Sequence, residues 1–484
     1  MSMLSHSAIY FIGNLIRYAA SFIMLPIYTN YLSPSEYGTV ELLVVGVDLV
    51  SIFIGVRLGQ GVFRYYTDAK NQTDKSSIIN SALIISLITN CIGLLLIYFL
   101  SSHYLEFLGD KNLEASYIQF FGLTLLFNAV IEIFLIVVRL NQSPVFFVFF
   151  NGSKLLVQIA VNLYFVAYLE QGVIGVIKAS VLTSALFSLV AFFLIFKKYS
   201  KNISAKYIKL LAVYSAPLLF AEIGLFYITF SDRFVLKYFY SAEAVGIYAL
   251  AAKFAALLLV FVWTPFQNTW DLEKYRIHKC EDANIQYQEV FKTLNAVLVL
   301  AMLLISFFVE ELIEILAPVE YMEAIYLAPI MLLGAYFKGI TAFVNFGILL
   351  KGKTFELAKV SFMSMFVITA LYLLLVPELG TFGAAISVTI TLGARLLWVY
   401  YKAKRLYDME LEWGGVIALV VVSMAASTLI LLIEWDFIFD IVLKLILFFL
   451  FIYALFRTSY FSHMQKTQFS ILVDGLFNRI RNLL

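Results

Sequence analysis

The stretch NLIRYAASFIMLPIYTNYLSPSEYGTVE, residues 14–41, decides the interpretation of the whole chain. It begins in an apolar segment that contains Arg17 and Pro26, passes through a polar turn at residues 33–36, and becomes apolar again after Gly38. A charged side chain within a membrane-length apolar segment is costly, and such residues usually serve a function. The stretch therefore predicts a membrane protein in which Arg17 has a functional role.

The composition extends this prediction to the full chain. Of the 484 residues, 62% are hydrophobic and 14% are charged, whereas about 25% of the residues of a soluble domain are charged. A chain so poor in charge cannot cover a surface that faces water, which predicts an integral membrane protein. The net charge of +2 gives no indication of nucleic-acid binding. The two cysteines and four scattered histidines predict neither a disulfide framework nor a metal site.

Fourteen apolar segments are long enough for transmembrane helices, which need about 20 residues each. They predict an all-α integral membrane protein. The predicted helices cover residues 9–29, 40–63, 78–100, 116–138, 145–168, 173–196, 211–232, 245–267, 291–309, 324–350, 355–376, 381–401, 414–433 and 437–456.

Lysine and arginine are concentrated in alternate loops, as expected when the basic loops face the cytoplasm. The basic loops lie near residues 64–75, 197–209, 274–292, 351–353 and 402–405. The opposite loops are poor in basic residues and include an acidic run at 310–323. This pattern predicts a multi-pass protein of the bacterial inner membrane with both termini in the cytoplasm.

The second half of the chain repeats the first at a spacing of 208 residues. The glycines that recur are Gly38, Gly172 and Gly175, which correspond to Gly246, Gly380 and Gly383. Because each repeat holds six predicted helices, both repeats have the same orientation, as in transporters built from parallel repeats. We predict six-helix bundles at residues 1–205 and 206–405 around a central cavity. Residues 406–484 then hold helices 13 and 14 and a cytoplasmic tail.

The predicted spans contain more basic than acidic side chains. The basic set is Arg17, Arg57, Lys154, Lys178, Lys253, Lys338, Lys359, Arg395 and Lys444, and the acidic set is Asp48, Glu132, Glu222 and Glu356. Those near helix ends, Lys444 among them, are expected to reach the membrane interface. Those nearer mid-helix predict an inward cavity, and the alternative is a buried ion pair, such as Asp48 with Arg17 or Lys154.

A polar stripe on the first helix supports the cavity. Tyr10, Asn14, Arg17 and Ser21 recur at intervals of three or four residues and share one helix face. A cavity with surplus positive charge suits a phosphate group, which arginine and lysine bind well. The predicted contacts to a diphosphate are Arg17, Lys154, Lys253 and Lys338. The acids Asp48, Glu132 and Glu222 are expected to be counter-ions or to couple transport to protons or sodium, with no other cofactor and no metal.

The sequence resembles the polysaccharide flippases, of the O-antigen type, in the multidrug/oligosaccharidyl-lipid/polysaccharide exporter superfamily. The resembling residues are Arg17, Leu25-Pro26, residues 31–38 (YLSPSEYG), Pro217, residues 231–236 (SDRFVL), Gly246-Ile247-Tyr248 and Pro265. The resemblance covers all fourteen predicted helices. Within it, the polar turn at 33–36 and its counterpart at 238–246 are expected to form the two halves of a gate.

The resemblance implies a transporter and not an enzyme. It implies two six-helix bundles, alternating access, and a lipid-linked oligosaccharide as the substrate, usually carried on undecaprenyl diphosphate. Membrane lipids and polysaccharide polymerase machinery are the other implied partners. Two alternatives stay open at this point: a small-molecule or drug exporter of the same fold, and a membrane glycan polymerase or glycosyltransferase, which would need catalytic acids or bases on a sizeable outer loop.

Overall fold

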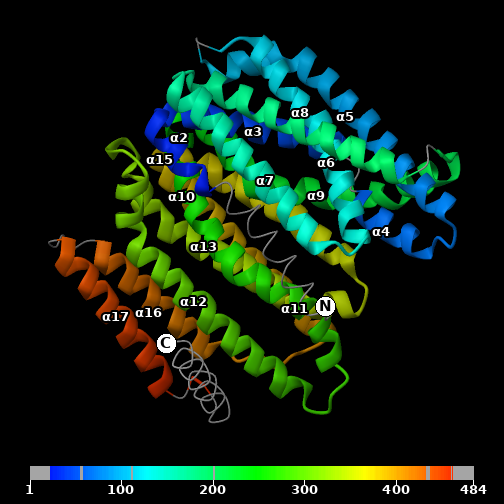
Figure 1. The fold of residues 1–484 in the computed structure, drawn as a ribbon. Helices are drawn as coiled ribbons and strands as arrows, with labels where there is room; N and C mark the ends of the chain where they lie inside the picture. The colour runs from blue at the N-terminus through cyan, green and yellow to red at the C-terminus, as the bar shows by residue number, and fades with distance from the viewer. Residues whose placement is uncertain are drawn as a thin grey trace, which may run out of the picture. The chain divides into compact units, whose positions relative to one another are not determined.

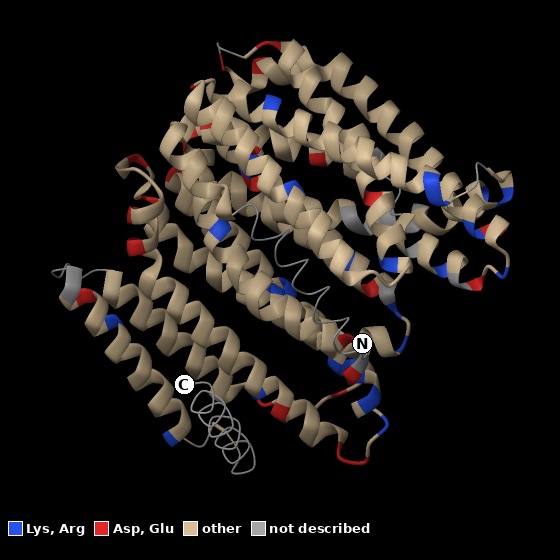
Figure 2. Cartoon of the chain, viewed as in Figure 1, with Lys and Arg blue, Asp and Glu red and all other residues tan. Residues whose placement is uncertain are grey.

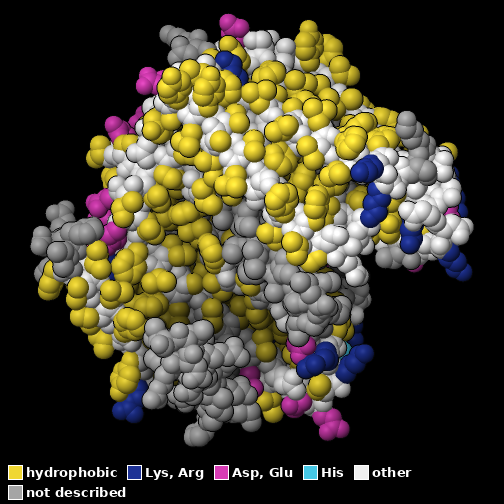
Figure 3. All heavy atoms as spheres, viewed as in Figure 1, with side chains coloured by type: hydrophobic (Ala, Val, Ile, Leu, Met, Phe, Trp, Pro, Cys, Tyr) yellow, Lys and Arg dark blue, Asp and Glu magenta, His cyan; other side chains and the backbone are white. Residues whose placement is uncertain are grey.

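The computed structural model describes residues 22–54, 58–110, 113–199, 202–431, 437–458 and 460–461. All regular structure in these ranges is helical (Figure 1). Ten of the described helices are long and apolar enough to cross a membrane. Lys, Arg, Asp and Glu lie mostly at helix ends and in loops (Figure 2), and hydrophobic side chains cover much of the face seen in Figure 3. The predicted all-α membrane fold is confirmed, whereas the count of fourteen spans stays a prediction.

The chain forms two compact units. Unit 1 comprises Met1–Lys253, Leu316–Glu323 and Ser361–Val388, and unit 2 comprises Phe254–Ile315, Ala324–Val360 and Thr389–Leu484. The helices with residues in unit 1 are α2 (Leu25–Tyr31), α3 (Pro34–Ile54), α4 (Leu58–Asp68), α5 (Gln72–Leu108), α6 (Ala115–Leu140), α7 (Pro144–Asn162), η1 (Leu163–Tyr168), α8 (Gly172–Lys198), α9 (Ala205–Phe239), α10 (Ala242–Leu258), η3 (Val319–Tyr321) and α15 (Thr354–Leu406). The predicted boundaries at 205 and 405 stay predictions.

The remaining helices belong to unit 2, which also includes the C-terminal end of α10 and both ends of α15. They are η2 (Leu259–Trp263), α11 (Thr264–Ile277), α12 (Ala283–Leu316), α13 (Ala324–Val344), α14 (Phe346–Leu350), α16 (Gly414–Leu431) and α17 (Phe437–Arg457). The last residue of α12 belongs to unit 1. Aromatic rings fill the core of this unit: Trp270 stacks on Phe343 with ring centroids 4.4 Å apart, and Phe291 and Tyr287 pack beside them.

In unit 1, α6 occupies the centre of the first helical bundle, between α5 and α8 (Figure 1). Its sequence from Ile131 to Val138 is apolar on almost every side, as expected for a helix that other helices surround. Phe134 packs on Phe150 of α7 with ring centroids 4.9 Å apart, and Phe150 contacts Phe187 of α8 at 5.2 Å. These contacts hold α6, α7 and α8 together.

The structure shows the sequence repeat at the level of single residues. Ser33 and Ser241, 208 positions apart, begin α3 and α10: the Ser33 hydroxyl accepts a hydrogen bond from the Glu36 amide at 3.3 Å, and the Ser241 hydroxyl accepts one from the Ala244 amide at 3.2 Å. Gly172 and Gly380 both adopt positive φ, at 54° and 56°, which side chains disfavour. Equivalent positions therefore carry out equivalent structural tasks in the two repeats.

Several helices begin or end away from the predicted positions. The polar turn at 33–36 is itself the start of α3, because Glu36 also accepts hydrogen bonds from the Ser33 amide and hydroxyl, completing a capping box. The predicted span 40–63 consists of α3 and α4, with residues 55–57 outside the described ranges. The predicted spans 355–376 and 381–401 form α15, with non-helical backbone at Gly380. Most of the first predicted helix, and the tail from residue 462, lie outside the described residues.

Candidate functional site

The starts of α3 and α10 cross at two glycines within unit 1. A Cβ atom on Gly38 would lie 1.7 Å from the carbonyl oxygen of Ala242, and one on Gly246 would lie 2.0 Å from the carbonyl oxygen of Pro34. Pro34 and Ala242 are also 208 positions apart, so equivalent residues of the two repeats meet each other. Small residues permit such close approach of helix backbones in membranes. We call this contact the repeat crossing.

Hydrogen bonds between the segment Leu316–Glu323 and residues 29–32 reinforce the repeat crossing. The Leu316 carbonyl accepts hydrogen bonds from the Thr29 hydroxyl and, at 3.2 Å, from the Asn30 amide. The Tyr321 hydroxyl donates to the Leu32 carbonyl at 3.1 Å. Because Leu316–Glu323 lies in the second sequence repeat and α2 in the first, these bonds also join the two repeats.

Two ion pairs lie next to the crossing. Lys253 Nζ on α10 is 2.9 Å from Glu41 Oε1 on α3, and Tyr37 donates a hydrogen bond to the same oxygen at 3.2 Å. On α9, Arg233 is 2.7 Å from Asp232, which also accepts a hydrogen bond from another side chain, the hydroxyl of Tyr248, at 2.8 Å. Each positive charge thus has a negative partner, as buried charges require.

Loss of the Lys253–Glu41 pair is expected to impair transport. Removing one partner of a largely buried pair leaves the other charge uncompensated, which costs about 2 kcal/mol or more. We expect Glu41→Gln and Lys253→Gln each to reduce transport about tenfold. The exchanged variant Glu41→Lys/Lys253→Glu should recover much of that loss, measured as transport rate per folded protein. Equal loss in the single and exchanged variants would show that the pair itself is not what transport needs.

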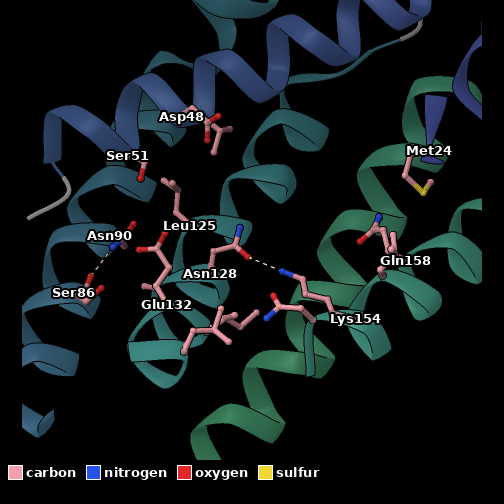
Figure 4. A pocket seen from close by; sticks show the side chains of 16 residues that line it. Met24, Asp48, Ser51, Ser86, Asn90, Leu125, Asn128, Glu132, Lys154 and Gln158 are labelled. Carbon is pink, nitrogen blue, oxygen red and sulfur yellow. Dashed lines mark hydrogen bonds between the residues drawn. The ribbon is translucent and has the colours of Figure 1, made fainter. Parts of the chain in front are cut away.

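A polar pocket of about 400 Å³ lies within unit 1 among α3, α5, α6 and α7, with Met24 at its border (Figure 4). Two carboxylates, one ammonium group and several amides and hydroxyls face it. The polar residues that line it are Asp48, Ser51, Ser86, Asn90, Asn128, Glu132, Asn151, Lys154 and Gln158. Lys154 Nζ donates a hydrogen bond to Asn128 Oδ1 at 3.4 Å. The volume falls in the range of about 300–1,000 Å³ that is typical of small-molecule sites.

The structure brings together three of the residues predicted for the site, since Asp48, Glu132 and Lys154 all face the pocket. Lys253 lies instead in the ion pair with Glu41. Lys338, on α13 of unit 2, is close enough to Arg395 for their charges to interact. The other predicted site residues, Arg17, Tyr10, Asn14 and Ser21, lie outside the described residues, as does the side chain of Glu222 on α9.

Sequence reasoning missed Glu41 and the pocket amides. Glu41 falls at the edge of the predicted span 40–63, so the predicted set of intramembrane acids does not include it. Asn90, Asn128 and Gln158 carry no charge, and the sequence does not show which faces of their three helices meet. A signal was present for Glu41, because its mirror position across the repeat lies only four residues before Lys253.

One basic residue near a helix end has three acidic neighbours. Lys444 on α17 is predicted to reach the membrane interface, which stays a prediction, and its side chain is fully buried. It contacts Asp440 at 2.5 Å, Glu311 of α12 at 2.8 Å and Glu310 at 3.6 Å. The three carboxylates hold the ammonium group inside unit 2, so the residue anchors α17 to α12. Among the described residues, no cluster of histidine, cysteine and acidic side chains could hold a metal ion.

Comparison with known proteins identifies relatives of this arrangement. The family model described as "Polysaccharide biosynthesis protein" matches residues 3–270. An uncharacterized membrane protein of Haemophilus influenzae (strain ATCC 51907 / DSM 11121 / KW20 / Rd) is 20% identical over 349 residues, which is 71% of this chain and 79% of the relative.

Two solved structures share the fold. The lipid II flippase MurJ, in an inward closed conformation, aligns with a TM-score of 0.67 and 14% identity over 94% of this chain and 99% of its own. An inward-facing multidrug resistance transporter of the MATE family, in the MOP superfamily, aligns with a TM-score of 0.63 and 15% identity over 83% and 96%. These neighbours are transporters and flippases, not enzymes. The resemblance to polysaccharide biosynthesis proteins is confirmed, whereas the O-antigen type stays a prediction.

Proposed function

Because the chain belongs to the polysaccharide biosynthesis protein family, we propose that it moves a lipid-linked oligosaccharide across the bacterial inner membrane for surface polysaccharide assembly. The observation that carries the proposal is the repeat crossing. There the first turns of α3 and α10, which are equivalent helices of the two repeats, contact each other. Alternating access between parallel repeats needs a contact between them that can open and close. The MATE family supports a drug exporter on fold alone, whereas the matched family concerns polysaccharide.

The repeat crossing acts as the outer gate in this proposal. The charge pattern of the loops supports an orientation with the segment Leu316–Glu323 outside the cell and both termini inside. With Gly38 and Gly246 in contact, the outer path is closed, and substrate enters from the cytoplasmic side. Separation of α3 from α10 then opens the outer path, which is alternating access between parallel repeats. Lys253 and Glu41 hold the closed state until substrate or ion binding separates them.

The diphosphate of the carrier lipid requires cationic contacts. Of the four cations predicted for this role, Lys253 is paired with Glu41, and Lys154 shares its pocket with two carboxylates. Arg17 therefore stays the first proposed cation for the diphosphate, and Lys338, near Arg395 in unit 2, is a separate candidate. Protons or sodium are the proposed coupling ions, with Asp48, Glu132 and Glu222 as the candidate carboxylates. Membrane lipids and the polysaccharide polymerase machinery are the proposed partners.

Depletion of the protein in its own host tests this function. We expect lipid-linked glycan to accumulate in the cytoplasmic leaflet while surface polysaccharide falls, measured by extraction of lipid-linked glycan and by surface labelling. Re-expression of the native protein should reverse both changes, and Arg17→Ala should not reverse them at equal protein level. Persistence of surface polysaccharide without a lipid-linked intermediate would contradict the proposal.

A further inference from the structure

We propose that the polar pocket among α3, α5, α6 and α7 binds hydroxyl groups of a sugar residue of the transported glycan. The inference rests on the proposed function and adds the place where the glycan, as distinct from the carrier lipid, is held. It starts from the arrangement in Figure 4, in which side chains from four helices converge on one space.

The pocket offers donors and acceptors side by side. The Asn90 amide nitrogen donates to the Ser86 carbonyl at 2.7 Å, which leaves the Asn90 amide oxygen as an acceptor. Asn128 receives the hydrogen bond of Lys154 on its oxygen, which leaves its amide nitrogen as a donor. The hydroxyls of Ser51 and Ser86 can do both. A sugar hydroxyl also donates and accepts, so mixed pairs of this kind match neighbouring hydroxyls of a sugar ring.

Several polar groups of the pocket have hydrogen-bonding capacity that no other described residue uses. Asp48, Glu132 and the side-chain amide of Gln158 make no hydrogen bond with another side chain or backbone group in the described ranges. Asp48 and Glu132 are both exposed to the pocket space. Unpaired polar groups within a membrane protein are costly unless water or a ligand satisfies them. The polar lining therefore suits a polar, hydrated occupant.

The charge of the pocket selects among polar occupants. Two carboxylates and one ammonium group give a formal charge of −1, which repels a phosphate group. A bare metal ion needs several oxygen ligands within about 2.6 Å of one point, so a coupling ion at Asp48 or Glu132 would fill only a small part of a pocket of about 400 Å³. A hydroxyl-rich neutral ring fits both the width and the mixture of groups.

Two amide variants of the full-length protein in lipid nanodiscs test the inference. Gln158→Leu and Asn128→Leu remove the hydrogen-bonding amides and leave side chains of comparable shape. Leu156→Ala is the control, because Leu156 on α7 is 69% exposed and outside the pocket lining. The probes are the lipid-linked oligosaccharide extracted from depleted host cells, bare undecaprenyl diphosphate, and the free oligosaccharide released by mild acid.

We expect each amide variant to bind the lipid-linked oligosaccharide about fivefold or more weakly, since one lost hydrogen bond corresponds to such a change. Affinity for bare undecaprenyl diphosphate should not change, and the control should match the native protein with both lipids. Competition by the free oligosaccharide against the native protein, lost in the variants, would support a pocket that recognises the sugar itself. Equal weakening with both lipids would overturn the inference, because the amides would then act on the carrier or on the fold.

The failure of this inference is distinguishable from failure of the proposed function. If the native protein binds the lipid-linked oligosaccharide and both amide variants bind it equally well, the sugar pocket is wrong and the flippase stands. If Asp48→Asn then shifts the pH dependence of transport, the pocket is a coupling site instead. If the native protein binds neither lipid, the proposed function fails and the pocket loses its premise.

Discussion

Valine at Gly38 is expected to stop transport and leave the protein folded. The new Cβ atom would lie 1.7 Å from the carbonyl oxygen of Ala242. The atom would therefore push α3 away from α10, and the closed crossing could not form. Overpacking of this kind costs about 1–3 kcal/mol, which corresponds to a decrease of about 5- to 150-fold in the closed population. We expect a decrease near the upper end of this range, because the new Cβ atom would meet a backbone atom and not the end of a flexible side chain. Gly246→Val should behave alike, since the contact is mirrored.

The measurement is transport rate beside a thermal unfolding curve for the same preparation. Gly152→Ala on α7 is the matched control, because nothing lies within 4 Å of a Cβ at that position. It should keep both native transport and native stability. Full transport by Gly38→Val would show that the crossing is not a gate, and loss of folding without a transport-competent fraction would show that it is only a structural contact.

Methionine at Lys444 is expected to destabilise unit 2 strongly. The substitution removes the ammonium group that contacts Asp440 and Glu311, and leaves the carboxylates of these two residues buried close together. Breaking a buried ion pair by removal of one partner costs about 3–5 kcal/mol. We expect a marked decrease in the unfolding temperature in detergent, or loss of α17 from its place against α12.

The control for Lys444 is an ion pair in the same unit that faces the surroundings. Lys402 is 3.2 Å from Glu356, and its side chain is 38% exposed, so Lys402→Met should change stability by about 1 kcal/mol or less. Adding Glu311→Gln and Asp440→Asn to Lys444→Met should restore part of the lost stability, because the neutral amides do not repel each other as the two carboxylates do. An unfolding temperature unchanged by Lys444→Met would contradict the role of the cluster as an anchor.

The sequence predicted the repeat well, because local chemistry determines it. Gly172 and Gly380 share a backbone conformation that favours glycine, and the polar turn after Leu32 contains the serine and glutamate of a capping box. Such features act within a few residues, so equal residues at equal spacing report equal structure. The meeting of Gly38 with Gly246 was suggested as a duplicated gate, but the sequence did not show that the two glycines touch.

The site was less predictable, because it depends on contacts between helices. Lys444 is predicted at the interface because it lies near a helix end, but the sequence does not show that Glu311, far away in the sequence, contacts it. The predicted span 211–232 ends just before Arg233, whereas the structure has Arg233 inside α9, paired with Asp232, which also accepts a hydrogen bond from Tyr248. Glu311 and Tyr248 come from other helices through packing, which neither hydropathy nor periodicity reports.

The central claim is tested most directly in vesicles that contain the purified protein and the lipid-linked oligosaccharide extracted from depleted host cells. A glycosidase that cannot cross the membrane measures how much glycan lies in the outer leaflet. The proposed function predicts that vesicles with native protein expose almost all of the glycan over time, while vesicles with Gly38→Val expose only the fraction that began outside. If native vesicles and protein-free vesicles expose equal amounts, the protein does not flip this lipid.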